Sequence, residues 1–289
     1  MKTEFIRTNG ITLHCKVAGN GPLVILLHGF PEFWFSWRRQ IPVLSQHYKV
    51  VAPDLRGYNL SDKPKGIKNY TLEVLVNDIK GLITALGEKK AIIVGHDWGG
   101  AIAWALAGFF PEMVSQLIIL NMPHPLELNK HLKKGSLQQW KKSWYMALFQ
   151  LPMLPEWRIY SKPEAFFYRA LKGWACRKEA FSDNDIAQYI EAFKDKASLT
   201  AAINYYRAVR YGNKRSDGRT WQKSPMPVLF IFGEKDRALG KELTYNTQNY
   251  CSGKLSIKYL KNASHWVQHD EPELVNRYIL DFLSDYNIS

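Results

Sequence analysis

The segment Ala91-Ile-Ile-Val-Gly-His-Asp-Trp-Gly-Gly100 joins a short apolar run to a carboxylate flanked by glycines. An uninterrupted apolar run of this length predicts a strand buried on both faces of a parallel sheet. The residues Gly99–Phe110 have a helical pattern, so Asp97 falls on the turn between strand and helix. The pattern G-x-nucleophile-x-G in this context predicts a nucleophile elbow. Glycine at positions 95 and 99 suits such a tight turn, because a β-carbon would clash there.

The residue type at the predicted elbow restricts the chemistry. A serine suits attack at a carbonyl carbon, whereas a carboxylate attacking an ester would form a reactive anhydride. The Asp97 carboxylate suits displacement at a saturated carbon that carries a leaving group, such as an epoxide oxygen or a halide. The alternative is a turn in which Asp97 only caps the following helix. The surrounding elements, together with two candidate partners further along the chain, favour the nucleophile.

Two residues near the C-terminus are candidates to complete a triad with Asp97. His265 follows the last predicted strand, and Asp236 lies in the loop after the strand before it. His265 would draw a proton from water, while Asp236 would hold the ring tautomer and stabilise the imidazolium. Glu234 is an alternative acid, although it lies closer to the strand end.

The motif His28-Gly29-Phe30-Pro31 follows the first long apolar run and predicts an oxyanion-hole loop. The backbone N–H groups of Phe30 and Trp98 are expected to point at the carbonyl oxygen of an ester on Asp97. The bond between Phe30 and Pro31 is a candidate cis peptide. The alternative for this motif is an ordinary Gly-Pro turn.

Several aromatic residues and histidines are candidates for the pocket around this site. His28, Phe33, Trp34 and Trp98 are expected to bind substrate, although Phe33 and Trp34 would serve equally well as core. The remaining histidines, including His124 and His269, are expected to lie in a pocket or at the surface.

Strand and helix patterns alternate on both sides of the elbow. Six apolar runs and a hairpin around Asn9-Gly10 give eight predicted strands. Helical patterns separate them, so the sequence predicts a doubly wound, mostly parallel α/β sheet with helices on both faces. The predicted strands are Glu4–Thr8, Leu13–Ala18, Leu23–His28, Tyr48–Pro53, Ala91–Gly95, Val114–Leu120, Val228–Gly233 and Leu255–Leu260, and the helices are Trp34–Gln46, Thr71–Leu86, Gly99–Phe110 and Leu274–Leu283.

The alternation stops after Pro125 and resumes at Val228. The intervening chain is aromatic, basic and helical in pattern to about Tyr211, which predicts an inserted α-helical cap. We expect a core formed by residues 1–125 and 214–289, and a cap formed by residues 126–213.

The charge of the chain is unevenly distributed. The net charge is +13, and residues 126–223 contain nineteen Lys and Arg against nine Asp and Glu. No basic stretch is interleaved with aromatic residues as in RNA-binding motifs, and no helix-turn-helix spacing is present, so nucleic acid is not an expected partner. A solvated basic face is the favoured interpretation, and attraction to anionic membrane surfaces or amphipathic anionic substrates is the alternative.

The sequence also bears on compartment and metal binding. No apolar run approaches the roughly 20 residues of a membrane span, and the N-terminus lacks the apolar region of a secretory signal. The three cysteines are Cys15, Cys176 and Cys251, and none forms a CxxC pair. This pattern argues against a disulfide framework and against zinc, and we expect a cytoplasmic protein without metal.

Taken together, the motifs resemble those of the epoxide hydrolases of the α/β-hydrolase superfamily. The matching segments are His28–Pro42, Asp54–Tyr58, Gly95–Gly100, Asn121–Pro125 and Ala263–Pro272. The resemblance implies the α/β-hydrolase fold with an eight-stranded sheet, and conversion of an epoxide to a vicinal diol through an ester on Asp97. It implies no cofactor, an apolar or amphipathic epoxide as substrate, and a monomer or homodimer.

In that family two cap tyrosines bind the epoxide oxygen and stabilise the alkoxide as the ring opens. Tyr145 occupies the place of the first, a few residues before Phe149-Gln150. Tyr206 directly precedes Arg207 and matches the second, with Tyr205 as the alternative. Packing of the cap against the core could also explain each tyrosine.

Two related families share an aspartate elbow, and a third alternative has no activity. Haloalkane dehalogenases usually have Asn where this chain has Phe30, and a benzyl side chain cannot donate to halide. Fluoroacetate dehalogenases carry arginines where this chain has Trp98 and Ala101, and a His-Trp pair where it has Trp144-Tyr145. A non-catalytic binding protein of the same fold would have lost the nucleophile, acid or histidine, and all three are present.

Overall fold

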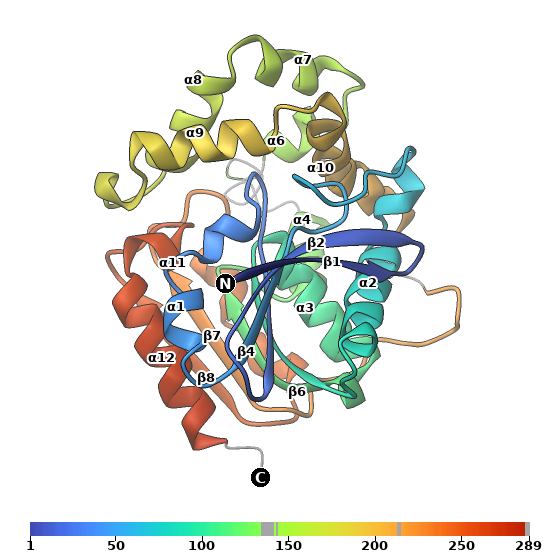
Figure 1. The fold of residues 1–289 in the computed structure, drawn as a ribbon, viewed down its shortest axis with the longest axis vertical. Helices are drawn as coiled ribbons and strands as arrows, with labels where there is room; N and C mark the ends of the chain where they lie inside the picture. Colours follow the sequence, from blue (N-terminus) through green and yellow to red (C-terminus); the bar gives the residue numbers. More distant parts are fainter. Residues whose placement is uncertain (134–141, 143, 213–214, 287–289) are drawn as a thin grey trace.

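The computed structural model describes residues 1–133, 142, 144–212 and 215–286 (Figure 1). Its centre is one eight-stranded sheet in the order β1-β2-β4-β3-β5-β6-β7-β8, which confirms the predicted number of strands. The pairs β1–β2 and β2–β4 are antiparallel, and all other neighbours are parallel. The strands are β1 (Lys2–Thr8), β2 (Ile11–Ala18), β3 (Leu23–Leu27), β4 (Lys49–Pro53), β5 (Ala91–His96), β6 (Val114–Leu120), β7 (Val228–Gly233) and β8 (Leu255–Leu260).

Each central strand contributes to two separate apolar cores, because successive side chains point to opposite faces of the sheet. In β5, Ile93 packs with α2 (Leu72–Ala85) and α3 (Trp98–Phe109) on one face. Ile92 and Val94 pack on the other face, with α1 (Ile41–Leu44) and α12 (Pro272–Asp285). Burial on both faces explains why these strands appear in the sequence as continuous apolar runs.

The predicted helix Trp34–Gln46 is wrong as one element. The structure has a 3₁₀ turn, η1 (Trp34–Trp37), and then the short helix α1. Pro42 stands in the first turn of α1. It has no N–H to donate to a carbonyl one turn earlier, so a continuous helix cannot run through it.

The chain between β6 and β7 is helical, as predicted, and most of it lies across one end of the sheet (Figure 1). The exception is α4 (Pro125–Lys133), which contacts α3 and the 3₁₀ turn η7 (Lys241–Thr244) of the core. The division into a core and a cap of residues 126–213 remains a proposal. The other helices here are α6 (Trp144–Leu148), α7 (Leu154–Ser161), α8 (Pro163–Phe167), η4 (Tyr168–Lys172), η5 (Lys178–Ala180), α9 (Asp183–Ala192), α10 (Lys196–Ala208) and η6 (Val209–Tyr211).

The short elements that complete the described chain connect the larger ones. They are η2 (Ile67–Tyr70), η3 (Pro111–Met113), η8 (Thr247–Tyr250) and α11 (Val267–Asp270). Within the described ranges, no helix has the length and apolar character needed to cross a membrane.

Candidate active site

Asp97 lies on a sharp turn between β5 and α3, with φ 50° and ψ −121°. This backbone conformation is rare for any residue with a β-carbon and is typically held in place by the surrounding structure. A β-carbon on Gly95 would lie 2.4 Å from the carbonyl oxygen of Gly99, and one on Gly99 would lie 2.1 Å from that of Leu27. The two glycines are therefore required by close backbone approach, in agreement with the predicted elbow.

His265 lies between the two carboxylates with which it was grouped from sequence. Its Nδ1 is 2.7 Å from Oδ2 of Asp236, and its Nε2 is 3.5 Å from Oδ2 of Asp97. Asp236 is held from its other side, since Oδ1 accepts from the N–H groups of Ala238 and Leu239 at 2.7 and 2.9 Å. The side chain of Asn121 also donates to Oδ2 of Asp236. The acid is thus oriented by four donors.

The protonation of this cluster follows from its burial and charges. Burial disfavours the charged form of His265, but the charges and hydrogen bonds of Asp236 and Asp97 outweigh it and raise the pKa to about 10. Burial would raise the pKa of Asp236, but His265 and Asn121 together lower it. The raised pKa of His265 favours the protonated imidazole in the free enzyme.

The loop after β3 supplies a donor to the nucleophile. The N–H of Phe30 donates to Oδ1 of Asp97 at 2.9 Å, and the peptide bond between Phe30 and Pro31 is cis. A β-carbon on Gly29 would lie only 2.4 Å from that of Asp97. This loop therefore approaches the carboxylate closely enough to serve as one half of an oxyanion hole, and Trp98, the first residue of α3, would supply the other half.

The two predicted cap tyrosines come together beside the nucleophile. The rings of Tyr145 and Tyr206 are 6.0 Å apart, and the ring of Tyr206 is 5.6 Å from that of Phe30 and 5.2 Å from that of Trp98. Burial, followed by the charge of Asp97, raises the pKa of both tyrosines, so their hydroxyl groups stay protonated. The arrangement places two protonated phenols near one carboxylate.

Tyr205 occupies a different environment from its neighbour. Its hydroxyl donates to the carbonyl oxygen of Arg56 at 2.7 Å, and its ring packs against Tyr58 and Tyr70. With the hydroxyl committed to the main chain, Tyr205 is less suited to bind substrate than Tyr206.

The three remaining predicted pocket residues differ in their surroundings. His28 is fully buried, and both ring nitrogens contact main-chain groups, of Gly29 at 2.9 Å and of Leu55 at 3.0 Å. It therefore has no free polar atom to offer a substrate and supports the oxyanion loop instead. Phe33 is buried against the ring of Tyr189, and Trp34 is half-buried beside Lys16. Their contact with substrate remains a prediction.

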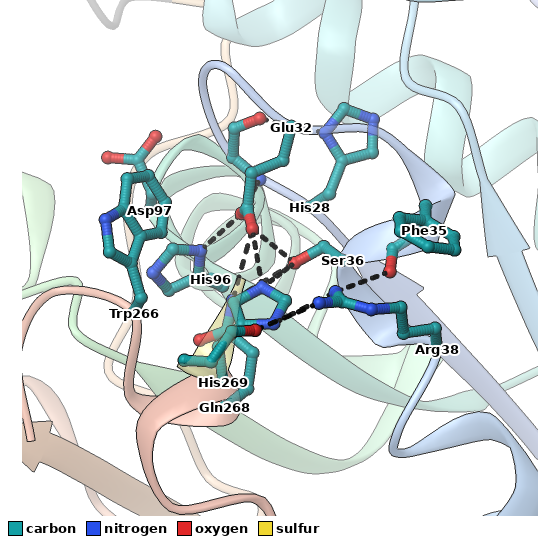
Figure 2. Close-up of polar contacts among 12 residues, drawn as sticks. His28, Glu32, Phe35, Ser36, Arg38, His96, Asp97, Trp266, Gln268 and His269 are labelled. Carbon is teal, nitrogen blue, oxygen red and sulfur yellow. Dashed lines mark hydrogen bonds and ion pairs between the residues drawn. The ribbon is translucent and has the colours of Figure 1, made fainter. Parts of the chain in front are cut away.

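Sequence reasoning missed a buried polar network behind the elbow (Figure 2). Its centre is Glu32, which is 0% exposed. The carboxylate lies 2.8 Å from Nδ1 of His96 and 3.0 Å from Nε2 of His269, and accepts from the hydroxyl of Ser36. The Nε2 of His96 donates to the carbonyl oxygen of His265 at 2.8 Å. Glu32 thus joins the oxyanion loop, the elbow and the His265 loop.

The charges in this network are defined by its hydrogen bonds. Burial would raise the pKa of Glu32, but His96 and His269 hold it well below its usual range. Burial lowers the pKa of His269 to about 4, so its ring is neutral. Arg38 donates to Nδ1 of His269 at 3.1 Å and pairs with Asp185 of α9 at 3.1 Å. The proton of His269 is therefore on Nε2, facing Glu32.

The expectation that His269 and His124 lie in a pocket or at the surface is wrong. Both are about 1% exposed, and the His124 ring stacks on Tyr250 at 3.9 Å. A signal for the network was present, because Glu32 directly follows the HGFP motif and His96 directly precedes Asp97. Across the described parts of the chain, no group of three or more His, Cys, Asp or Glu side chains could hold a metal ion.

Comparison with known proteins agrees with this geometry. Residues 22–272 match the family model of the alpha/beta hydrolase fold. The chain is 43% identical to the AB hydrolase superfamily protein YfhM of Bacillus subtilis, over 99% of both chains. It is 39% identical to epoxide hydrolase 1 of Caenorhabditis elegans, over 98% of this chain and 70% of the relative. The crystal structure of Bacillus megaterium epoxide hydrolase in complex with an inhibitor superposes with a TM-score of 0.87, at 33% identity over 97% of this chain and 100% of that one.

The chain therefore belongs to the α/β-hydrolase superfamily and, within it, to the epoxide hydrolase family. Both the fold class and the family resemblance inferred from the motifs are confirmed.

Proposed function

We propose that this protein hydrolyses an epoxide to a vicinal diol through a covalent ester on Asp97. The observation that carries the proposal is the position of the Asp97 carboxylate, which accepts from the Phe30 N–H on one side and faces His265 on the other. This environment suits a carboxylate that first acts as a nucleophile and then, as an ester, needs an oxyanion donor and a base. The epoxide hydrolase relatives support the same activity.

In the first step, an oxygen of Asp97 attacks the less hindered epoxide carbon from the side opposite the ring oxygen. A carbon–oxygen bond to Asp97 forms while the strained ring bond breaks, and its electron pair goes to the departing oxygen. Tyr145 and Tyr206 donate hydrogen bonds to that oxygen, which develops negative charge. Because the burial that raises their pKa also excludes water, these phenols stabilise the alkoxide more than bulk solvent would.

In the second step, water attacks the carboxyl carbon of the ester. Esterification removes the charge of Asp97, so His265 can give its proton to the alkoxide of the first step and become neutral. The neutral ring then accepts a proton from the attacking water, Asp236 stabilises the imidazolium, and the N–H groups of Phe30 and Trp98 stabilise the oxyanion. Collapse of the tetrahedral intermediate breaks the acyl carbon–oxygen bond, and the remaining proton of the added water passes to the leaving oxygen, so the diol leaves and the Asp97 carboxylate is restored. One carboxylate oxygen then derives from water, and the former Asp97 oxygen leaves in the diol.

The surroundings of Asp97 favour an uncharged, apolar or amphipathic epoxide. Trp98 and Ala101 follow the nucleophile and carry no charge that would hold a carboxylate substrate. The Phe30 side chain cannot donate to halide, and its ring packs against Phe149 and Tyr206. Dehalogenation by the same nucleophile is therefore disfavoured.

Single-turnover hydrolysis in ¹⁸O-labelled water tests the ester mechanism. With enzyme in excess over a styrene-oxide-like substrate, the label should enter the Asp97 carboxylate, and the first diol should be unlabelled. Peptide mass spectrometry locates the label. A first diol that carries all of the label would contradict the ester and indicate direct attack by water.

A comparison of substrates tests the choice of leaving group. Diol release from the epoxide is measured beside halide release from a chloroalkane and from fluoroacetate. We expect diol formation to dominate. Rapid halide release without diol formation would replace the epoxide assignment with a dehalogenase.

A further inference from the structure

A short segment of the cap exposes an unusual amount of apolar surface. Among the described residues twelve large apolar side chains are exposed, and four of them lie within seven consecutive residues: Leu151 (45%), Met153 (77%), Leu154 (43%) and Trp157 (68%). We call these four residues the apical patch. Leu151 and Met153 precede α7, and Leu154 and Trp157 lie in its first half. In Figure 1, α7 lies at the end of the molecule opposite α12. Apolar side chains gathered in this way commonly mark an interaction site, whereas single exposed ones need no explanation.

The segment is held in place by a buried cation beneath it. Arg207, which is 7% exposed, donates to the carbonyl oxygens of Phe149 and Leu151 at 3.0 and 2.7 Å and forms a two-pronged ion pair with Glu156. Arg207 therefore binds two carbonyl oxygens and one carboxylate next to the apical patch, while the four apolar side chains of the patch are exposed. Met153 adopts a left-handed conformation, φ 60°.

The outer face of α7 combines apolar and cationic side chains. Leu154, Trp157, Arg158 and Ser161 are exposed and follow the spacing i, i+3, i+4, i+7 of one helix face, while Ile159 is buried. Lys162 directly follows the helix and is also exposed. Tryptophan beside lysine and arginine on one helix face is typical of segments that lie in the boundary between lipid head groups and acyl chains.

The charge of the cap favours an anionic partner. Within the described ranges no carboxylate forms an ion pair with Arg158 or Lys162, since none lies within 4.0 Å of their nitrogens. Residues 126–223 carry nineteen basic against nine acidic side chains. A second copy of this chain would bring two such basic surfaces together, and like charges repel. Nucleic acid would leave the four apolar side chains without a partner.

We propose that the apical patch docks the protein on an anionic lipid surface. Met153, Leu154 and Trp157 enter the head-group boundary, and Arg158 and Lys162 contact the lipid phosphates. The attachment is peripheral and reversible, since it uses one short helix. It goes beyond the hydrolysis of epoxides and does not depend on it.

Sedimentation of the full chain with vesicles tests this inference. The protein should bind vesicles of phosphatidylcholine mixed with phosphatidylglycerol, and hardly bind pure phosphatidylcholine. A cation near an anionic surface contributes about 1 kcal/mol, or roughly fivefold in partitioning, so R158Q/K162Q should weaken binding roughly 30-fold. M153S/W157S should weaken it by at least as much, because it removes the inserted side chains.

Matched controls separate the patch from exposed apolar residues in general. Phe5 and Tyr245 are 60% and 58% exposed and lie outside the cap, so F5S/Y245S should bind vesicles like the unmodified chain. Thermal melting and hydrolysis of a water-soluble epoxide without vesicles should be unchanged in all three variants, which excludes loss of fold.

Three results would overturn the inference. The first is failure of the unmodified chain to bind the anionic vesicles. The second is binding of M153S/W157S equal to that of the unmodified chain, which would indicate attraction to polyanions without docking of the patch. The third is conversion of a dimer to a monomer by M153S/W157S in sedimentation equilibrium, which would assign the patch to a second copy.

Discussion

The Nε2 atom of His265 lies 3.5 Å from Oδ2 of Asp97, a distance longer than a hydrogen bond of usual length. The opposite side of the same ring is held tightly, at 2.7 Å from Asp236. The imidazole is therefore anchored by the acid rather than by the nucleophile. Such an arrangement allows Asp97 to change from carboxylate to ester without displacing the base.

Replacing His265 with Gln should separate the two chemical steps. Asp97 can still attack the epoxide, but no base activates water, so the ester should accumulate and turnover should fall roughly 10³-fold or more. Intact-protein mass spectrometry should show one substrate mass added to H265Q. The D97N variant is the control and should gain no mass. If H265Q carried no added mass after incubation with substrate, the assignment of His265 as the base would be contradicted.

Replacing the cap tyrosines with Phe should distinguish Tyr145 and Tyr206 from Tyr205. Loss of a proton donor to the epoxide oxygen should lower kcat/KM roughly 10²-fold in Y145F and in Y206F. Y205F removes only the hydrogen bond to the Arg56 carbonyl, so it should lose about 1 kcal/mol of stability and keep its activity. Steady-state kinetics and urea unfolding measure both effects. If Y205F were stable but inactive while Y206F remained active, Tyr205 rather than Tyr206 would be the tyrosine that binds the epoxide oxygen.

The pKa of His265 should change during turnover. In the free enzyme, Asp236 and Asp97 raise this pKa to about 10, and esterification removes the charge of Asp97. We therefore expect ester hydrolysis to follow a pKa lower than that of the free enzyme, measured by rapid-quench kinetics and by NMR titration of His265. In D236N the NMR pKa should fall and turnover should drop roughly 10³–10⁴-fold. A pKa that is the same with and without the ester would exclude the proposed influence of Asp97.

Acid should destabilise the protein through His269. Its pKa is about 4 when folded and 6.5 when exposed, so the unfolded state binds the extra proton between these values. Above pH 6.5 the ring is neutral in both states, so His269 does not lower the free energy of unfolding. As the pH falls towards 4, proton uptake by the unfolded state lowers the free energy of unfolding by about 3 kcal/mol at most. Urea unfolding across this range measures the slope.

H269Q provides the matched variant for that experiment. Gln can donate to Glu32 and accept from Arg38, as the neutral ring does, but it does not titrate. The slope between pH 4 and 6.5 should therefore flatten in H269Q. An unchanged slope would assign the acid sensitivity to other groups, such as Glu32, whose lowered pKa also makes stability fall with acid.

Local signals were sufficient for the strands and the nucleophile. A strand buried on both faces must be continuously apolar, and a strained turn with close backbone contacts must carry glycines, so β5, Gly95 and Gly99 could be recognised within ten residues. The residue type of Asp97 was sufficient to predict displacement at a saturated carbon as its chemistry. The helix predicted over Trp34–Gln46 failed because Pro42 was given too little weight.

The sequence by itself therefore determined the sheet, the elbow and the position of Asp97 on it, since each depends on neighbouring residues. Tertiary structure decided the rest. Adjacent residues on α10 point about 100° apart, and only packing against the core turned Tyr206 towards Asp97 and tied Tyr205 to Arg56. Glu32 became the centre of a network because the fold brought together histidines 64 and 237 residues away. A buried carboxylate is stable only when it is hydrogen-bonded or paired, and its partners can come from distant parts of the chain. A local sequence pattern therefore does not predict them.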